Sequence, residues 1–283
     1  MINRVLATVH PIGHVSPSGD FGWACLAAKE ARRFADLPGM IFGGSYAEAS
    51  AWMRSQATEA RAFVVIFTRG DGMEEFLGGL SSEVSALPMA GGAAARSSGP
   101  GFTHPMAEDV AVLALTEGEW QAASVAAHFP AGDTLSCLGH DRRRFSMVRT
   151  GDGTVDAHEF LHTARAAHGL APGDWDRLAL VTNEGIVLHL HEEGGLVVSG
   201  ADLPASREVR PALFDPSRGR EAILAHASPE TLAFGCAGLF ELFGEDRPWE
   251  ALMPTTYLFG ELATTSASPR FANLTFSLLI RRP

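Results

Sequence analysis

Two short runs that are apolar almost throughout constrain the fold of this chain more than any other feature. Ala62–Thr68 reads AFVVIFT, and Asp109–Leu115 reads DVAVLAL. A strand with apolar side chains on both of its faces is typical of a sheet that is covered on both sides. Helices are expected nearby at Tyr46–Ala60 and Met73–Ala86, and Leu87–Gly92 is expected to be a short strand that ends on paired glycines. This alternation predicts an α/β protein, with α+β elements, in which helices cover sheets.

The chain is expected to fold as two halves of alternating strands and helices, 1–137 and 138–283. The boundary is placed in the segment 130–144, where glycine, aspartate and a run of arginines occur close together. In the first half, a strand at Arg4–Val9 precedes a helix at Gly19–Phe34.

The second half begins with a strand at Phe145–Val148 and continues with a helix at Asp156–His168. Turn residues then separate short strands that read as an antiparallel meander. The remaining expected elements are the strands Leu178–Val181, Ile186–His191, Leu196–Ser199, Thr231–Cys236, Thr255–Leu262 and Phe271–Ile280 and a helical turn at Ala237–Phe243.

Composition excludes several classes of partner. The chain has 283 residues, 46% of them hydrophobic, and a net charge of −11. A globular fold is expected, and neither nucleic acid nor an anionic membrane is an expected partner. The run Arg142–Arg144 is interpreted as a solvated loop. No segment has the ~18 uninterrupted apolar residues of a membrane-spanning helix.

Three cysteines, Cys25, Cys137 and Cys236, are few and odd in number. This argues against a disulfide framework and suits a reducing cytoplasm. The N-terminus has no signal-peptide pattern. A cytoplasmic location is therefore expected.

The C-terminal fifty residues carry the most specific pattern in the chain. FGCAGLFELFG at Phe234–Gly244, TTYLFGELA at Thr255–Ala263 and FANLTFSLLI at Phe271–Ile280 resemble the C-terminal part of the FIST family. The residues that fall on the family's pattern are Gly260, Glu261, Asn273 and Thr275, whereas Ala272 stands where the pattern has a polar residue. The segment LPMAGGAAA at Leu87–Ala95 resembles the family's N-terminal half less specifically.

The resemblance implies a bacterial sensory domain that binds a small ligand. Such domains also occur in some F-box proteins. Amino acids are the ligands usually proposed for the family, and some members resemble haem-bearing nitric-oxide sensors.

The residues themselves allow a binding site in a pocket between the halves. Glu261 offers a carboxylate, and Asn273 offers amide donors and an acceptor, so that together they can hold an ammonium group or an amide. Gly260 allows the backbone to bend or a ligand to approach closely. The expected site also includes Tyr257, Gly91 and Gly92. The alternative is that Glu261 and Asn273 pair with each other or with loop backbone.

Histidines provide a competing metal site. His158-Glu159-x-x-His162 is the zincin pattern, and His168 stands where a third ligand of a metzincin would. Histidines at i and i+4 lie on one helical face and can share a zinc ion, with the intervening glutamate as general base.

Three observations favour a solvated helix face instead. Arg165 stands where the metzincin pattern needs a glycine. An apolar stripe of Phe160, Ala164 and Ala167 predicts that His158, His162 and Arg165 face solvent. The segment Asp156–Glu159 reads as a capping box.

A second pair of histidines, His189 and His191, has the i, i+2 spacing that places both imidazoles on one face of a strand. They can bind a metal or a haem. The alternative is a half-exposed strand with histidines on its solvent side.

The leading hypothesis is a cytoplasmic, non-catalytic protein of FIST type that binds a small ligand and signals through a partner protein. No cofactor is assigned. The first alternative is a zinc- or haem-binding protein, either a metalloenzyme or a gas sensor, that uses His158 and His162 or His189 and His191. The second is a protein-interaction scaffold.

Overall fold

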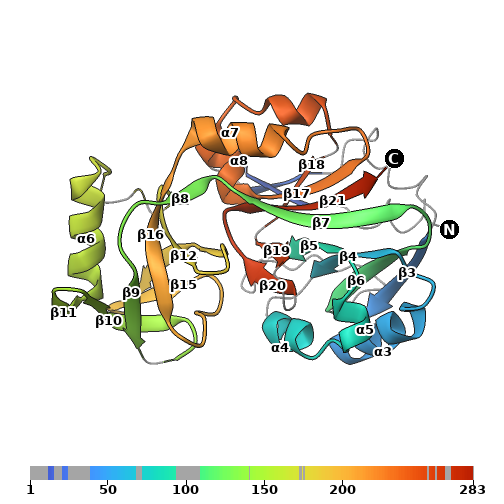
Figure 1. Ribbon diagram of the computed structural model, residues 1–283, viewed down its shortest axis with the longest axis horizontal. Helices are drawn as coiled ribbons and strands as arrows, with labels where there is room; N and C mark the ends of the chain where they lie inside the picture. The colour runs from blue at the N-terminus through green and yellow to red at the C-terminus, as the bar shows by residue number, and fades with distance from the viewer. Residues whose placement is uncertain are drawn as a thin grey trace. The chain divides into compact units, whose positions relative to one another are not determined.

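The computed structural model describes residues 12–15, 21–24, 39–67, 72–93, 109–139, 141–171, 174, 176–253, 255–258, 260–264 and 269–282. The protein contains both helices and sheets and is rich in strand (Figure 1). The chain divides into two compact units. Unit 1 comprises residues 1–125, 223–271 and 275–283, and unit 2 comprises 126–222 and 272–274. Residues 223–271, which were expected in the second half, thus belong with the N-terminal residues.

A six-stranded sheet of unit 1 contains both apolar runs. Its order is β20-β19-β5-β4-β6-β3. The strands are β3 (Gly39–Gly44), β4 (Ala62–Phe67), β5 (Met89–Ala93), β6 (Val110–Leu115), β19 (Glu261–Thr264) and β20 (Pro269–Ala272). Strand β4 runs parallel to β5 and antiparallel to β6. Every residue of β4 and β6 is buried, as their composition predicts.

A second sheet of unit 1 has the order β18-β17-β21-β7. Its strands are β7 (Glu119–Ala126), β17 (Thr231–Cys236), β18 (Thr255–Leu258) and β21 (Thr275–Arg282). Strand β17 is parallel to β18 and antiparallel to β21. The predicted strand Thr231–Cys236 and the helix that follows it, α8 (Ala237–Phe243), are confirmed with their predicted bounds.

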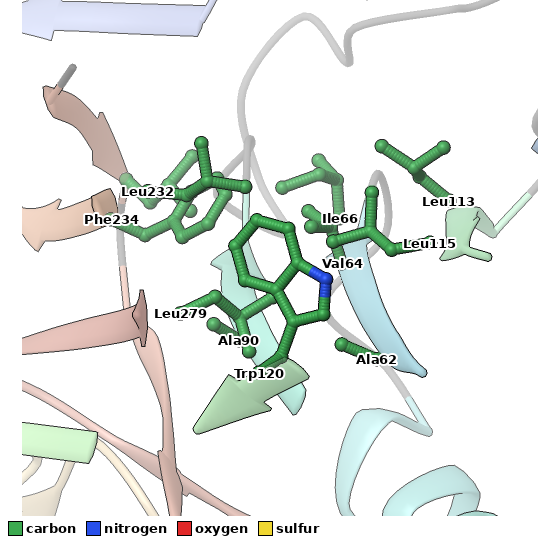
Figure 2. Close-up of a cluster of buried hydrophobic side chains, with 11 residues drawn as sticks. Ala62, Val64, Ile66, Ala90, Leu113, Leu115, Trp120, Leu232, Phe234 and Leu279 are labelled. Atoms are coloured by element: carbon green, nitrogen blue, oxygen red, sulfur yellow. The ribbon is translucent and has the colours of Figure 1, made fainter. Parts of the chain in front are cut away.

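The core of unit 1 lies between these two sheets. Figure 2 shows the Trp120 ring from β7 among side chains of both sheets, including Val64 and Ile66 from one and Phe234 and Leu279 from the other. In a strand, residues two apart share a face, so alternate residues of β4 enter the same layer. The two sheets therefore pack face to face.

The helices of unit 1 are short. Helix α3 (Tyr46–Gln56) begins with a capping box, in which Glu48 N donates to Ser45 Oγ and the Glu48 carboxylate accepts from Ser45 N. It ends four residues before the predicted end at Ala60. The predicted helix Met73–Ala86 is divided into α4 (Met73–Gly78) and α5 (Ser82–Ser85). The break follows Gly78 and Gly79, because glycine is a weak helix former. A 3₁₀ helix, η1, spans Pro248–Ala251.

Two predicted strands near the C-terminus are wrong as continuous elements. Thr255–Leu262 is divided between β18 and β19, which lie in different sheets. The break contains Gly260, whose φ is 144°, a conformation that glycine adopts without strain. Phe271–Ile280 is divided between β20 and β21, and Leu274 in the break has a φ of 53°. A leucine gives no sequence signal for this positive φ.

The first described strands are β1 (Ile12–Val15) and β2 (Phe21–Ala24), which pair antiparallel. The predicted helix Gly19–Phe34 is therefore wrong at Phe21–Ala24, because cross-strand pairing overrides a helical apolar spacing there. The rest of that helix and the predicted strand Arg4–Val9 lie outside the described residues.

Unit 2 is built on a nine-stranded sheet in which β13-β12-β16-β9-β10-β15-β14 form the main path. The strands are β8 (His128–Pro130), β9 (Leu135–Gly139), β10 (Arg144–Thr150), β11 (Gly153–Asp156), β12 (Leu178–Thr182), β13 (Val187–Leu188), β14 (Leu190–Glu193), β15 (Leu196–Ser199) and β16 (Glu208–Phe214). Only His189 separates β13 from β14, the two ends of the path. The sheet therefore curls until its ends meet. The expected boundary segment 130–144 contains β9, and the chain passes from unit 1 to unit 2 at residues 125 and 126.

Two further helices, α6 and α7, belong to the described elements. Helix α6 (Ala157–Ala167) confirms the helix predicted at Asp156–His168, and Asp156 caps it by accepting from the main-chain N of His158 and Glu159. Helix α7 spans Pro216–Leu224. Among the described helices, none has the length and apolar character needed to cross a membrane.

Truncation of Phe234 tests the core of unit 1. This side chain is 2% exposed and packs between the two sheets. Phe234→Ala should lower the free energy of unfolding by about 3–5 kcal/mol in urea titrations, because it leaves a cavity. Leu252→Ala is the control, since Leu252 is 47% exposed, and it should cost less than about 1 kcal/mol. Equal effects of the two changes would contradict the packing described.

Candidate functional site

Glu261 is a fully buried carboxyl group at the first position of β19. It is 0% exposed, and it lies opposite Gly92 of β5. Acidic side chains are almost never fully buried unless they are paired. The hydrogen-bond partners of its two oxygens therefore decide whether this buried group is satisfied.

The two oxygens of Glu261 differ in their contacts. Oε2 accepts from the main-chain N of Thr275 at 3.4 Å and from Thr275 Oγ1 at 3.3 Å. Within the part of the chain that the structure describes, Oε1 is buried and has no hydrogen-bond partner. A buried polar atom without a partner is rare in folded proteins, and it needs an explanation.

Burial raises the pKa of Glu261 well above its ordinary value. Hydrogen bonds from Thr275, from the Cys236 thiol and from the Gly260 main chain oppose this effect but are smaller. Burial disfavours the charged form of a carboxyl group, so folding shifts Glu261 towards its neutral form. The folded protein holds this proton more tightly than the unfolded chain does. The free energy of unfolding therefore falls as the pH rises above the unfolded pKa, and Glu261 costs stability at neutral pH.

The glycines around Glu261 allow backbones to approach one another. A Cβ at Gly91 would collide with the Val65 carbonyl oxygen, and one at Gly260 with the Phe271 ring. A Cβ at Gly92 would collide with the Gly260 carbonyl oxygen. The space where a side chain would project from these three predicted ligand-binding glycines is thus occupied by the protein's own atoms.

Asn273, the other predicted recognition element, belongs to unit 2, whereas Glu261 belongs to unit 1. Its main-chain N donates to the Val187 carbonyl oxygen at 3.1 Å. Its side-chain amide lies against Gly200, where a Cβ would collide with it. Asn273 is 8% exposed, and its Oδ1 has no partner among the described residues. It lies in the break between β20 and β21 rather than at the start of a strand. For Tyr257, the structure describes only the main chain, in β18.

His158 and His162 lie in α6, and His168 is the residue that follows its last turn. His158 Nδ1 lies 3.0 Å from Glu192 Oε1, and this hydrogen bond is the main reason that the pKa of His158 is raised. His162 and His168 are exposed. The prediction that Arg165 faces solvent is wrong: the buried stripe is Ala157, Leu161 and Arg165. These residues repeat every four positions and so share one face of the helix, and burial at Arg165 reaches the guanidinium nitrogens Nε and Nη2.

The second pair of histidines lies in the curl of the unit 2 sheet. His189 Nε2 is 2.8 Å from Asp176 Oδ1. The rings of His189 and His191 are stacked with their centroids 6.2 Å apart. No cluster of three His, Cys, Asp or Glu side chains suited to a metal ion occurs among the residues whose placement is described.

His128 is a buried histidine that the sequence patterns did not single out. It is 2% exposed, and its Nε2 lies 2.6 Å from the Asp176 carbonyl oxygen. The carbonyl can only accept, so Nε2 carries the proton and Nδ1 does not. Burial lowers the pKa of His128 to about 4, although the Asp176 carbonyl opposes this effect. The only sequence signal is a histidine in the apolar context Val125-Ala126-Ala127.

Comparison with known proteins gives no relative: no family model matches the chain, and no curated protein does. The site is therefore interpreted from its own geometry.

Substitution of Gly91 tests the close approach of strands beside Glu261. Gly91 has a φ of 138°, and a Cβ there would overlap the main chain of Val65. Gly91→Ala should lower the free energy of unfolding by at least about 2 kcal/mol in urea titrations. Gly151→Ala is the matched control, because a Cβ there meets no atom within 4 Å. If Gly91→Ala is as stable as the control, this packing is wrong.

Acidification tests the burial of His128. Its folded pKa is about 4, below the ordinary 6.5, so the unfolded chain takes up the proton first. Stability is fully present above pH 6.5 and should fall by up to roughly 3 kcal/mol as the pH drops to 4. Urea titrations across this range should show a shallower slope for His128→Gln. His162→Gln, at an exposed position, should keep the wild-type slope, and an unchanged slope for His128→Gln would contradict the burial.

Proposed function

We propose that this protein binds a small ligand through the Glu261 carboxyl group. The observation that carries the proposal is the Oε1 atom of Glu261, which is buried and has no partner in the described part of the chain. A neutral buried carboxyl that costs stability is expected where function, not folding, maintains it. A ligand atom that bonds to Oε1 would satisfy this group.

The surroundings of Glu261 support this assignment. Gly260, Glu261 and Thr275, three residues that carry the resemblance to the FIST family, are neighbours in unit 1, and Thr275 bonds to Glu261. Cys236, from the first of the resembling segments, bonds to the same carboxyl. We therefore keep the proposal of a cytoplasmic, non-catalytic sensory protein of FIST type, with helices covering its sheets, that acts through a protein partner.

For the zinc or haem alternative, His158 Nε2 is also buried without a hydrogen-bond partner among the described residues, but no third metal-binding side chain joins it in a cluster there. His158 and His189 each pair with a carboxylate. Metal analysis and a visible spectrum of the purified protein decide this alternative independently. Stoichiometric zinc that is lost in His158→Ala/His162→Ala would replace the proposal, as would a haem absorption band.

A thermal-shift screen with amino acids and other small metabolites tests ligand binding. At least one compound should raise the midpoint of unfolding of the wild type, because binding to the folded state stabilises it by mass action. Glu261→Met should abolish the shift and should itself fold, since it replaces a neutral buried carboxyl by an apolar group of similar size. Glu119→Met, at an exposed position of β7, should keep the shift.

A broad panel that stabilises neither the wild type nor Glu119→Met would remove the support for the proposed function. A compound that stabilises Glu261→Met as much as the wild type would show that it binds elsewhere.

A further inference from the structure

The chemical character of the ligand follows from the inequality of the two Glu261 oxygens. Oε2 accepts from the main-chain N–H of Thr275 and from its hydroxyl group. A main-chain N–H can only donate, so Oε2 acts as an acceptor. In a neutral carboxyl group, the proton then resides on the other oxygen, Oε1.

Geometry also favours the neutral form of this group. Glu261 is 0% exposed, and its interactions with the described residues are hydrogen bonds with Thr275, Cys236 and Gly260, without a cationic side chain. Burial of an unpaired carboxylate is so costly that such groups take up a proton instead. The hydroxyl at Oε1 is thus a hydrogen-bond donor that has no acceptor within the described part of the chain.

We infer that the ligand presents an uncharged hydrogen-bond acceptor to Glu261 Oε1, such as an amide, lactam or ketone oxygen or an unprotonated ring nitrogen. This inference rests on the proposed function. It narrows the expectation from the sequence, which allowed either an ammonium group or an amide.

An ammonium group fits this site poorly for two reasons. It has three donors and no acceptor, so it would face the Oε1 hydroxyl donor to donor. Its binding would require Glu261 to release its proton and would leave a buried ion pair, whose desolvation can exceed the electrostatic gain. An acceptor such as an amide oxygen completes the site without any proton transfer.

Two matched variants separate these chemistries. Glu261→Gln keeps a hydrogen-bond donor at the same place but loses the capacity for a negative charge. Glu261→Met loses both the donor and the capacity for a negative charge. A neutral acceptor should therefore bind Glu261→Gln within about tenfold of wild type, a change of about 1.4 kcal/mol. A cation should bind neither variant.

The protonation state is tested first, without any ligand. Infrared difference spectra at pH 7 between the wild type and Glu261→Gln should contain the C=O band of a protonated carboxyl. Glu119→Gln is the control, and its difference spectrum should lack that band. A carboxylate signal from Glu261 would overturn the inference but leave the proposed function standing.

Binding is then measured with two pairs of probes, each made of a neutral acceptor and a cation of similar shape. The pairs are benzamide with benzylamine and 2-pyrrolidinone with pyrrolidine. Any compound from the screen is measured in the same way. Titration calorimetry in two buffers of different ionisation enthalpy measures the number of protons that the protein and the probe release on binding. We expect the neutral members to bind with no proton release and to bind Glu261→Gln.

Binding of the amines alone, with about one proton released per site, would overturn the inference while supporting a ligand site at Glu261. If no probe or screened compound binds the wild type, the proposed function fails, and the inference fails with it.

Discussion

The close approach of β5 and β19 is the constraint on which the candidate site depends. Gly92 and Gly260 meet backbone to backbone, and Gly91 lies against the main chain of Val65. Side chains at these positions would separate the strands. Glu261, which lies opposite Gly92, is fully buried, and burial raises the pKa of its carboxyl group. The glycines thus allow the close packing of the strands beside Glu261.

The Glu261 carboxyl group bonds to side chains from two segments of unit 1 that lie far apart in the sequence. Cys236 comes from the end of β17, and Thr275 comes from the beginning of β21, which pairs with β17. Both side chains bond to Glu261. Thr275 satisfies Oε2, whereas Oε1 is buried without a hydrogen-bond partner among the described residues.

Parts of this fold were predictable because their cause is local. The apolar runs Ala62–Thr68 and Asp109–Leu115 are buried strands, and the strand and helix between Thr231 and Phe243 have their predicted bounds. The break at Gly260 had a sequence signal in the glycine itself, whereas the break at Leu274 had none, because a leucine does not indicate a positive φ. The stripe of α6 was predicted wrongly because Arg165 was counted as a solvent-facing residue, whereas the fold buries it together with its guanidinium nitrogens.

The site was predictable only in part, for a similar reason. The sequence singled out Glu261, but the charge state of a carboxyl group depends on burial, which comes from contacts between separate segments. It did not single out His128, whose partner Asp176 is 48 residues away. The prediction that Glu261 and Asn273 act together rested on the closeness of their segments in the sequence, and in the structure Glu261 belongs to unit 1 and Asn273 to unit 2.

Electron density next to Glu261 Oε1 tests the central claim most directly. The measurement is a high-resolution crystal structure of the protein purified without added ligand, together with one soaked with the strongest compound from the thermal-shift screen. The account predicts density of a bound molecule whose uncharged acceptor atom lies within hydrogen-bond distance of Oε1. A protein group or a single ordered water that satisfies Oε1 in both crystals would contradict it.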